Sequence, residues 1–288
     1  MMSHTLHYGS GCFEGIKCYS TPDGPAIFRL EDHMIRLHSS ALAFELDLPY
    51  SVDVLVQAAI DIVQANQVEA CYIRPIAFYG YDSLGVHPNS CPVHVAIACF
   101  DWGAYLGQAG LEKGVRVTYS PWVKAHWSSF PTTAKANGQY LNSLLAVRDA
   151  KKRGFDEAIL LNMEGNIAEG SGQNLFLVKD GVVRTNDEKS SILLGITRES
   201  VIQLCRDLSI PVEIGDITKE DLQSADEVFF TGTATEVTPI REIEDQVIGK
   251  GRPGPITDRL RTLYFEIMGG RQPEYRHWLA YVQKTISE

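Results

Sequence analysis

The chain has 288 residues, of which 44% are hydrophobic, and its 26 basic and 36 acidic side chains give a net charge of −10. This length suits roughly two domains of about 150 residues, with a sizeable core. An acidic chain without a basic run is a poor candidate for binding nucleic acid or an anionic membrane, and no apolar run approaches the roughly 20 residues of a membrane span.

The N-terminus lacks the charged and then apolar pattern of a signal peptide, and the cysteines include no C-x-x-C pair. Several cysteines lie inside apolar runs, which indicates small, reduced core residues. We therefore expect a cytoplasmic protein. The six cysteines are Cys12, Cys18, Cys71, Cys91, Cys99 and Cys205.

The first hundred residues predict an α+β unit. A helix is expected over residues 31–45, and Ser51 has the side chain of an N-cap before a second helix, in which the apolar residues between 52 and 63 keep helical spacing. The β-rich runs are joined by turn and loop sequences, so we expect a strand meander. The expected strands are residues 12–19, 25–30, 71–79 and 93–100.

The stretch that begins at Trp102 is rich in glycine and aromatic residues and has no period, so we take it as the link between two domains. The expected division is a small N-terminal domain over residues 1–101, an interdomain loop over 102–113 and a large C-terminal domain over 114–288. Strands outnumber crossover helices in the second half, which predicts a mixed, pseudo-barrel sheet rather than a doubly wound one. The strands expected there are 115–119, 157–162, 174–178, 182–185 and 227–230.

Two helix starts are indicated in the second half. Thr197, with Ile196 before it, predicts an N-cap with a hydrophobic staple, and Thr218 with Asp221 predicts a capping box. Two further helices carry apolar residues at helical spacing, and we expect those faces to be buried. These residues are Leu141, Leu144 and Leu145 in one helix and Leu260, Leu263, Tyr264 and Ile267 in the last.

Lys135 lies in Pro131-Thr-Thr-Ala-Lys135-Ala-Asn-Gly-Gln-Tyr140, a tight connection that leads into a helix. A lysine amine held where water is scarce loses some of its preference for the charged form and can become a nucleophile. The alternative is a solvated surface lysine, as most lysines are, and this stretch alone does not decide between the two.

Three features suit a phosphate group. Gly195-Ile-Thr-Arg198 opens a helix, where free N–H groups and the helix dipole favour an anion. The turn Thr231-Gly-Thr-Ala-Thr235 gathers hydroxyls and backbone donors, and Arg36 offers a planar guanidinium. Their ordinary alternatives are a capped helix, a polar turn and a surface arginine. The sequence has no phosphate-loop motif and no strand-linked G-x-G-x-x-G, so a nucleotide is not the expected phosphate carrier.

Glu169 is a single carboxylate among the small residues of Ala168-Glu-Gly-Ser-Gly172, just before a strand. Such a carboxylate can face a cationic ring nitrogen, and the alternative is an exposed turn glutamate. The eight histidines show no metal-ligand spacing, so no metal is expected. The absence of G-x-S-x-G leaves a serine-hydrolase site unsupported.

Seven motifs follow one another along the chain: His7-Tyr-Gly-Ser-Gly-Cys-Phe-Glu-Gly-Ile16, Tyr72-Ile-Arg-Pro75, Pro131-Thr-Thr-Ala-Lys135, Tyr140-Leu-Asn-Ser143, Glu169-Gly-Ser-Gly-Gln-Asn-Leu-Phe176, Gly195-Ile-Thr-Arg198 and Thr231-Gly-Thr-Ala-Thr-Glu-Val-Thr-Pro239. Together they resemble the branched-chain amino acid aminotransferases, a family of fold-type IV pyridoxal phosphate enzymes. The resemblance implies an α+β fold with a small α/β-sandwich-like N-terminal domain and a larger pseudo-barrel C-terminal domain. It also implies a homodimer or higher homo-oligomer whose subunits share their active sites.

The resemblance implies pyridoxal 5'-phosphate as the cofactor, with Lys135 forming the Schiff base. Tyr140 is then expected at the ring hydroxyl, Glu169 at the ring nitrogen and Leu193 against the ring. The phosphate would be held by Arg36, Ile196, Thr197 and Thr233. The substrate would be bound by Tyr72 and the Thr233-Ala234 turn at its α-carboxylate, and by Tyr8, Phe13, Gly15, Arg74, Trp102 and Tyr105 around its side chain, some of them from the partner subunit.

The implied reaction is the reversible transamination of leucine, isoleucine and valine with 2-oxoglutarate, so the expected partners are amino acids and 2-oxo acids. D-amino acid aminotransferase and aminodeoxychorismate lyase share the lysine, glutamate and phosphate contacts, but Tyr72-Ile-Arg-Pro75 and the Thr233-Ala234 turn favour the branched-chain interpretation. A non-catalytic pyridoxal phosphate-binding dimer is the alternative from another class. It would not need the lysine, tyrosine and glutamate together.

The sequence departs from the family pattern at three places. The chain starts almost at the His7 motif, where the family usually has a further N-terminal strand. Lys17 stands where arginine is frequent, and Val123 and Lys124 follow Trp122 where the family often has arginines. Lysine gives a point charge rather than a fork, so carboxylate recognition is expected to differ at position 17. None of the presumed cofactor-binding residues is lost.

Overall fold

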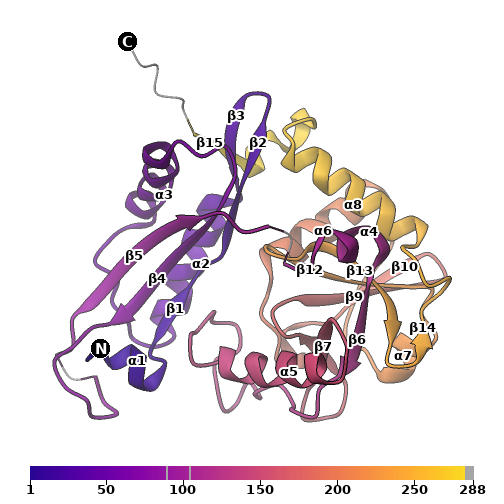
Figure 1. Ribbon diagram of the computed structural model, residues 1–288, viewed down its shortest axis with the longest axis horizontal. Coiled ribbons are helices and arrows are strands. Elements are labelled where there is room, and N and C mark those ends of the chain that lie inside the picture. The colour runs from indigo at the N-terminus through magenta and orange to yellow at the C-terminus, as the bar shows by residue number, and fades with distance from the viewer. Residues whose placement is uncertain (89, 104, 283–288) are drawn as a thin grey trace. The chain divides into compact units, whose positions relative to one another are not determined.

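The computed structural model describes residues 1–88, 90–103 and 105–282, and its chain forms two compact units (Figure 1). Unit 1 comprises Met1–Trp102, Ala134–Tyr140 and the chain from Phe265 onward, and unit 2 comprises Gly103–Thr133 and Leu141–Tyr264. No helix in the described part of the chain combines the length and the apolar character needed to cross a membrane.

Unit 1 is built on an antiparallel sheet. Its strands are β1 (Gly11–Phe13), β2 (Ile16–Thr21), β3 (Gly24–Phe28), β4 (Cys71–Tyr79), β5 (Val93–Phe100) and β15 (Leu279–Tyr281). They follow the order β1-β4-β2-β3-β15, with β5 also paired to β4. The expected meander is wrong, because β1 and β2 both pair with the distant strand β4. The helical segments of this unit are α1 (His4–Tyr8), α2 (Leu30–Leu42), α3 (Val52–Asn66) and the 3-10 turn η2 (Pro273–Trp278).

Helices α2 and α3 cover one face of this sheet. Met34 and Leu37 of α2, Leu55 of α3 and Ile73 of β4 belong to one buried cluster. The expected N-cap of α3 is confirmed, since the Ser51 side chain accepts the N–H of Val54. Because side chains alternate along a strand, the neighbours of Ile73 in β4 lie on the opposite face. That opposite face carries the functional side chains described below.

Unit 2 holds a mixed sheet in the order β11-β10-β9-β12-β13-β6-β7-β8, with β14 paired to β13. Its strands are β6 (Val115–Tyr119), β7 (Glu157–Leu161), β8 (Ile167–Gly170), β9 (Asn174–Lys179), β10 (Val182–Thr185), β11 (Val212–Ile214), β12 (Glu227–Gly232), β13 (Glu236–Ile243) and β14 (Gln246–Val247). The sheet curls, because a tight turn in which the Gly170 N–H donates to the Gln173 carbonyl (2.7 Å) brings β8 back beside β9. The expected hairpin of β9 and β10 is confirmed.

The helical segments of the second half are α4 (Gln108–Lys113), α5 (Tyr140–Lys152), η1 (Glu188–Ser190), α6 (Ile196–Asp207), α7 (Lys219–Gln223) and α8 (Pro255–Met268). The capping box of Thr218 and Asp221 is confirmed at the start of α7. The predicted N-cap at Thr197 is wrong, because Gly195 is the N-cap of α6 and Thr197 lies inside the helix. The helix therefore begins two residues earlier than predicted, at a residue without a capping side chain.

The buried face of α5 is not the one predicted. Ala146 and Ala150 are its buried residues, whereas Leu141, Leu144 and Leu145 are 66%, 47% and 43% exposed. The predicted helical period is confirmed, but the small alanines pack inward and the leucines form an exposed apolar stripe.

The two units divide the chain differently from the expected boundaries at 101 and 114. The segment Ala134–Tyr140 and strand β15 group with unit 1, although both lie in the expected C-terminal domain. Residues 102–113 are not only a loop, because they include helix α4 of unit 2. Contacts of high sequence separation produce these differences.

Candidate active site

Backbone hydrogen bonds fix the Lys135 segment to unit 1. The carbonyl of Lys135 accepts the N–H of Phe13 (3.1 Å), and its own N–H donates to the Ser40 hydroxyl (2.9 Å). The N–H of Gly138 donates to the Gly9 carbonyl (3.1 Å), where a Cβ on Gly9 would lie 2.7 Å from the Gly138 Cα. Only glycine permits this approach, so Lys135 is held rigidly against β1.

The amine of Lys135 has a specific partner. Its Nζ donates to the Tyr140 hydroxyl at 2.6 Å and lies 5.0 Å from the centre of the Phe13 ring. The Phe13 and Tyr140 rings are 4.8 Å apart. Lys135 is only partly exposed. The structure thus places the amine against a hydroxyl and an aromatic wall, as a nucleophile would need, rather than as a solvated surface lysine.

Arg74 lies on the same face of the unit 1 sheet. Its guanidinium carbon is 4.7 Å from the centre of the Phe13 ring, 5.4 Å from that of Tyr72 and 6.0 Å from that of Trp102. The Arg74 Nε is buried and has no hydrogen-bond partner in the described part of the chain. A stacked guanidinium with an unmet donor beside aromatic rings suits a guest that is apolar or carries a distal carboxylate.

Gly15 makes room for Tyr72. A Cβ at Gly15 would lie 1.8 Å from the Tyr72 hydroxyl oxygen and 2.8 Å from the carbon that bears it. The Tyr72 ring also packs edge-on against Trp102, with ring centres 4.5 Å apart. The tyrosine hydroxyl therefore occupies the space that any larger residue at position 15 would fill.

For the activity that the sequence resemblance implies, we expect Gly15→Ala to lower kcat/KM for the amino donor by at least about tenfold, because the Tyr72 ring must move and small misplacements at a reacting centre are costly. Steady-state kinetics with the implied amino donor measures this. Gly85→Ala is the matched control in unit 1, since its Cβ would meet only the His87 carbonyl at 3.9 Å. Equal kinetics for the two variants would contradict the role of Gly15.

Arg36 joins a buried charged cluster. Its Nε and Nη2 donate to the two oxygens of the Glu14 carboxylate (2.7 and 2.9 Å), and His33 Nδ1 lies 2.7 Å from Glu14 Oε2. Burial alone would lower the pKa of Arg36, but Glu14 outweighs it and raises the pKa. Arg36 is therefore a permanent cation, oriented by its two hydrogen bonds to Glu14.

The remaining predicted residue of unit 1 is Tyr8, which is 45% exposed and whose hydroxyl donates to the Leu84 carbonyl (2.5 Å). The aromatic ring of Tyr8, rather than its hydroxyl, is therefore the part that could contact the substrate side chain. Tyr105 belongs to unit 2 and is 39% exposed. The ring contacts described for Tyr8 are with His4 (4.7 Å) and His7 (6.4 Å).

Glu169 is buried at the end of β8 in unit 2, with 5% of its surface exposed, and is not an exposed turn residue. Its Oε2 accepts the Asn174 side-chain amide (3.2 Å) and the N–H of Leu193 (3.2 Å). Its Oε1 pairs with the Lys124 ammonium at 2.5 Å. The same Asn174 amide donates to the Leu193 carbonyl (2.7 Å), so one side chain ties the carboxylate to the segment before α6.

The start of α6 is suited to an anion. No side chain caps this helix, and the hydroxyl of Thr197 is buried without a hydrogen-bond partner in the described residues. A Cβ on the N-cap Gly195 would lie 2.1 Å from Asn174 Oδ1, which requires glycine there. Open N–H groups and an unmet hydroxyl are the donors that a phosphate takes.

The turn between β12 and β13 supplies a second set of donors in unit 2. Gly232 pairs with Glu236, so the half-buried Thr233 and the residue after it, Ala234, lie at the hairpin tip. The Thr231 hydroxyl is buried without a partner among the residues described. The predicted turn is therefore present, and the Thr231 hydroxyl beside it has no hydrogen-bond partner among the described residues.

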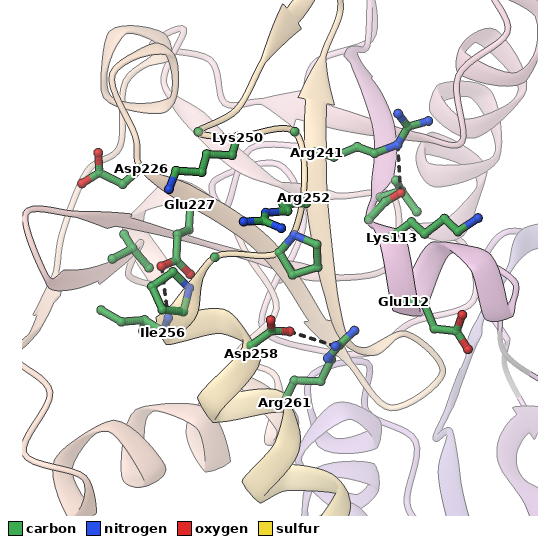
Figure 2. A pocket seen from close by; sticks show the side chains of 18 of the residues that line it. Glu112, Lys113, Asp226, Glu227, Arg241, Lys250, Arg252, Ile256, Asp258 and Arg261 are labelled. Carbon is green, nitrogen blue, oxygen red and sulfur yellow. Dashed lines mark hydrogen bonds and ion pairs between the residues drawn. The ribbon is translucent and has the colours of Figure 1, made fainter.

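A separate open cavity of about 1550 Å³ in unit 2 is lined by none of the predicted site residues. Several of its charged side chains have partners within the fold. In Figure 2, the Glu227 carboxylate accepts the N–H of Ile256 (3.1 Å) and Asp258 pairs with Arg261 (2.8 Å). Glu227 also accepts the N–H of Thr257 (2.7 Å) at the start of α8. Cavity size alone therefore does not locate the chemistry.

Four residues that the sequence alone left without a role are tied by the structure to the predicted site residues: Glu14, Ser40, Lys124 and Asn174. Glu14 and Asn174 lie inside quoted motifs, which was the available signal. Among the residues described, no group of three or more His, Cys, Asp or Glu side chains is arranged to hold a metal ion.

The amino-transferase class IV family model matches residues 11–243, and the chain belongs to this family. Its relatives include the branched-chain-amino-acid aminotransferase of Pseudomonas aeruginosa, which is 44% identical over 283 residues, 98% of this chain and 92% of the relative.

Two solved structures are similar to the whole chain. The branched-chain amino acid aminotransferase of Escherichia coli is 43% identical with a TM-score of 0.96, covering 98% of this chain and 93% of that one. The branched-chain amino acid aminotransferase of Thermobaculum terrenum in its PLP form is 35% identical with a TM-score of 0.92, covering 98% and 92%. The resemblance and the α+β pseudo-barrel fold predicted from the sequence are confirmed.

Proposed function

We propose that the protein transfers the amino group between leucine, isoleucine or valine and 2-oxoglutarate, using pyridoxal 5'-phosphate. The observation that carries this proposal is the amine of Lys135 at 2.6 Å from the Tyr140 hydroxyl, on a segment locked to β1. The 44% identity to a branched-chain-amino-acid aminotransferase supports the choice of substrate.

The residues present fit the cofactor. Lys135 would bind it covalently, Tyr140 would meet its ring hydroxyl, and Glu169 would meet its ring nitrogen with Leu193 against the ring. The uncapped start of α6, with the unmet Thr197 hydroxyl, supports a phosphate site at Ile196 and Thr197. Thr233 and Arg36 are the further phosphate ligands that the family resemblance implies. When bound, the cofactor supplies the electron sink for the carbanion at the substrate Cα.

The chain's own groups supply the proton transfer and the orientation. Lys135 would take the proton from the substrate Cα, a contribution of roughly 10²–10⁴-fold. The Thr233-Ala234 turn and Tyr72 would bind the α-carboxylate. The residues proposed around the substrate side chain are Tyr8, Phe13, Gly15, Arg74, Trp102 and Tyr105.

Arg74 gives the pocket its dual specificity. An apolar side chain can lie against the Phe13 ring while the guanidinium stays stacked, and the carboxylate of glutamate can pair with the same group. We expect Arg74→Met to raise KM for 2-oxoglutarate by about 10- to 100-fold, the worth of one charge-assisted hydrogen bond, and to change KM for leucine by much less. Parallel kinetics with both substrates tests this, and an equal rise for the two would contradict it. The KM of Arg74→Lys for 2-oxoglutarate should lie between the values of the wild type and of Arg74→Met.

A homodimer is proposed on the exposed stripe of α5. Leu141, Leu144 and Leu145 are 66%, 47% and 43% exposed, and Trp122 and Val123 add exposed apolar surface. Clustered exposed leucines are typical of protein interfaces. Sedimentation of the wild type and of Leu144→Glu measures the oligomeric state, and a monomeric wild type would contradict the proposed homodimer.

The free, mostly buried thiols support a reducing compartment such as the cytoplasm.

The function is tested by incubating the protein with pyridoxal phosphate, 2-oxoglutarate and either L-leucine or D-alanine. We expect 4-methyl-2-oxopentanoate from L-leucine and no product from D-alanine, and the reverse pattern would overturn the proposal. Borohydride reduction followed by peptide mapping should place the label on Lys135. A label on another lysine would equally contradict the assignment.

A further inference from the structure

Lys124 is a buried lysine with one carboxylate partner. Its side chain is 6% exposed, that of Glu169 is 7% exposed, and their Nζ and Oε1 atoms are 2.5 Å apart. Its backbone N–H donates to the Leu161 carbonyl (2.7 Å), which fixes the start of the side chain beside β7. Lysine is almost never buried unless paired, so this contact needs an explanation beyond chance.

The partners of Glu169 can be counted against the capacity of a carboxylate, which is about four acceptor sites. The Asn174 amide and the Leu193 N–H occupy Oε2, and Lys124 occupies one site of Oε1. One site on Oε1 is left. A point charge suits this arrangement, since an arginine fork would compete for the oxygen that Asn174 and Leu193 already hold.

We propose that Lys124 is a positioning residue, which fixes the Glu169 carboxylate by a direct ion pair and leaves the remaining site of Oε1 for the cofactor ring nitrogen. This inference rests on the proposed function. A carboxylate fixed there would face the ring nitrogen of a bound cofactor and help to keep that nitrogen protonated, which the cofactor's electron-sink chemistry requires. Lys124 thus acts through Glu169 and touches no substrate.

The test compares the wild-type holoenzyme with Lys124→Met and Lys124→Arg. We expect Lys124→Met to shift the pH midpoint of the bound-cofactor absorbance by about one unit or more, the usual effect of an opposite charge. Its Kd for pyridoxal phosphate should rise measurably. Lys124→Arg keeps the positive charge on a differently shaped side chain, so its pH midpoint and its Kd should lie between those of the wild type and Lys124→Met. Lys179→Met is the control, because Lys179 pairs with Asp226 at 3.6 Å on the surface. This variant should change neither the pH midpoint nor the Kd for pyridoxal phosphate.

A second measurement uses the protein without cofactor. Lys124→Met leaves Glu169 as a buried carboxylate without its ammonium partner, so the melting temperature of this variant should be lower than that of the wild type. Adding Glu169→Gln to Lys124→Met should restore part of the lost melting temperature. The comparison of the wild type, Lys124→Met and the double variant measures the interaction between Lys124 and Glu169, even where Lys124→Met alone is much less stable. A wild type that binds no pyridoxal phosphate would overturn the proposed function. A wild type that binds it while Lys124→Met titrates identically would overturn the role of Lys124.

Discussion

We expect that replacing Lys135 by alanine abolishes transamination and leaves the protein folded. Turnover should fall by at least the roughly 10²–10⁴-fold that a positioned proton-transfer group contributes, and the proposed covalent attachment of the cofactor should be lost with it. The fold survives because the segment is held by the backbone of Lys135, to Phe13 and Ser40, and the side-chain amine donates only to Tyr140 among the described hydrogen bonds. Coupled assays with L-leucine and 2-oxoglutarate, with circular dichroism for the fold, measure both.

Lys151→Ala is a suitable control for this variant, because Lys151 is an exposed residue in the last turn of α5 and its replacement removes a similar charge. It should keep wild-type turnover. Tyr140→Phe should retain part of the activity, since it removes the hydroxyl beside the amine but keeps the aromatic ring. Turnover retained by Lys135→Ala would show that another group carries the chemistry.

The local elements and the motif residues could be predicted from the sequence, because they depend on short-range patterns. Strands β4 and β5 were predicted with their observed bounds, and the Ser51 cap and the Thr218 capping box follow from side chains that bond within a few residues. Lys135, Glu169 and the start of α6 were singled out by their local chemistry and then by the family resemblance. Their individual roles stay predictions until the variants are made.

The rest depends on contacts that no local pattern records. Strand β15 pairs with β3 across the length of the chain, and Glu14 meets Arg36, 22 residues away, only after α2 packs on the sheet. The helical period of α5 is the same whether alanines or leucines face inward, so the pattern could not select the buried face. Lys124 carries no motif of its own, and only the structure shows its partner.

Glu14→Gln should lower the apparent Tm by about 6–20 °C at pH 7, since breaking a buried ion pair costs about 3–5 kcal/mol. The Glu14 carboxylate is fully buried and holds both Arg36 and His33, so the variant leaves the buried guanidinium charge without this counter-ion. Differential scanning calorimetry measures the shift. Asp23→Asn, which breaks the exposed pair with Arg276, is the control and should change Tm little.

The same cluster predicts acid sensitivity. Burial would raise the pKa of Glu14, but Arg36 and then His33 outweigh it and hold the pKa well below its ordinary 4.5. Burial lowers the pKa of His33 below 6.5 despite Glu14, and its Nε2 has no hydrogen-bond partner in the described residues. Both groups bind more protons in the unfolded chain, so stability is fully present above about pH 6.5, declines as pH falls below that value, and declines further below about 4.5. Glu14→Gln should reduce the decline below about pH 4.5, to which Asp221 with its lowered pKa also contributes, and should keep the decline that begins below about pH 6.5. A wild-type Tm that rises as the pH falls would contradict this prediction.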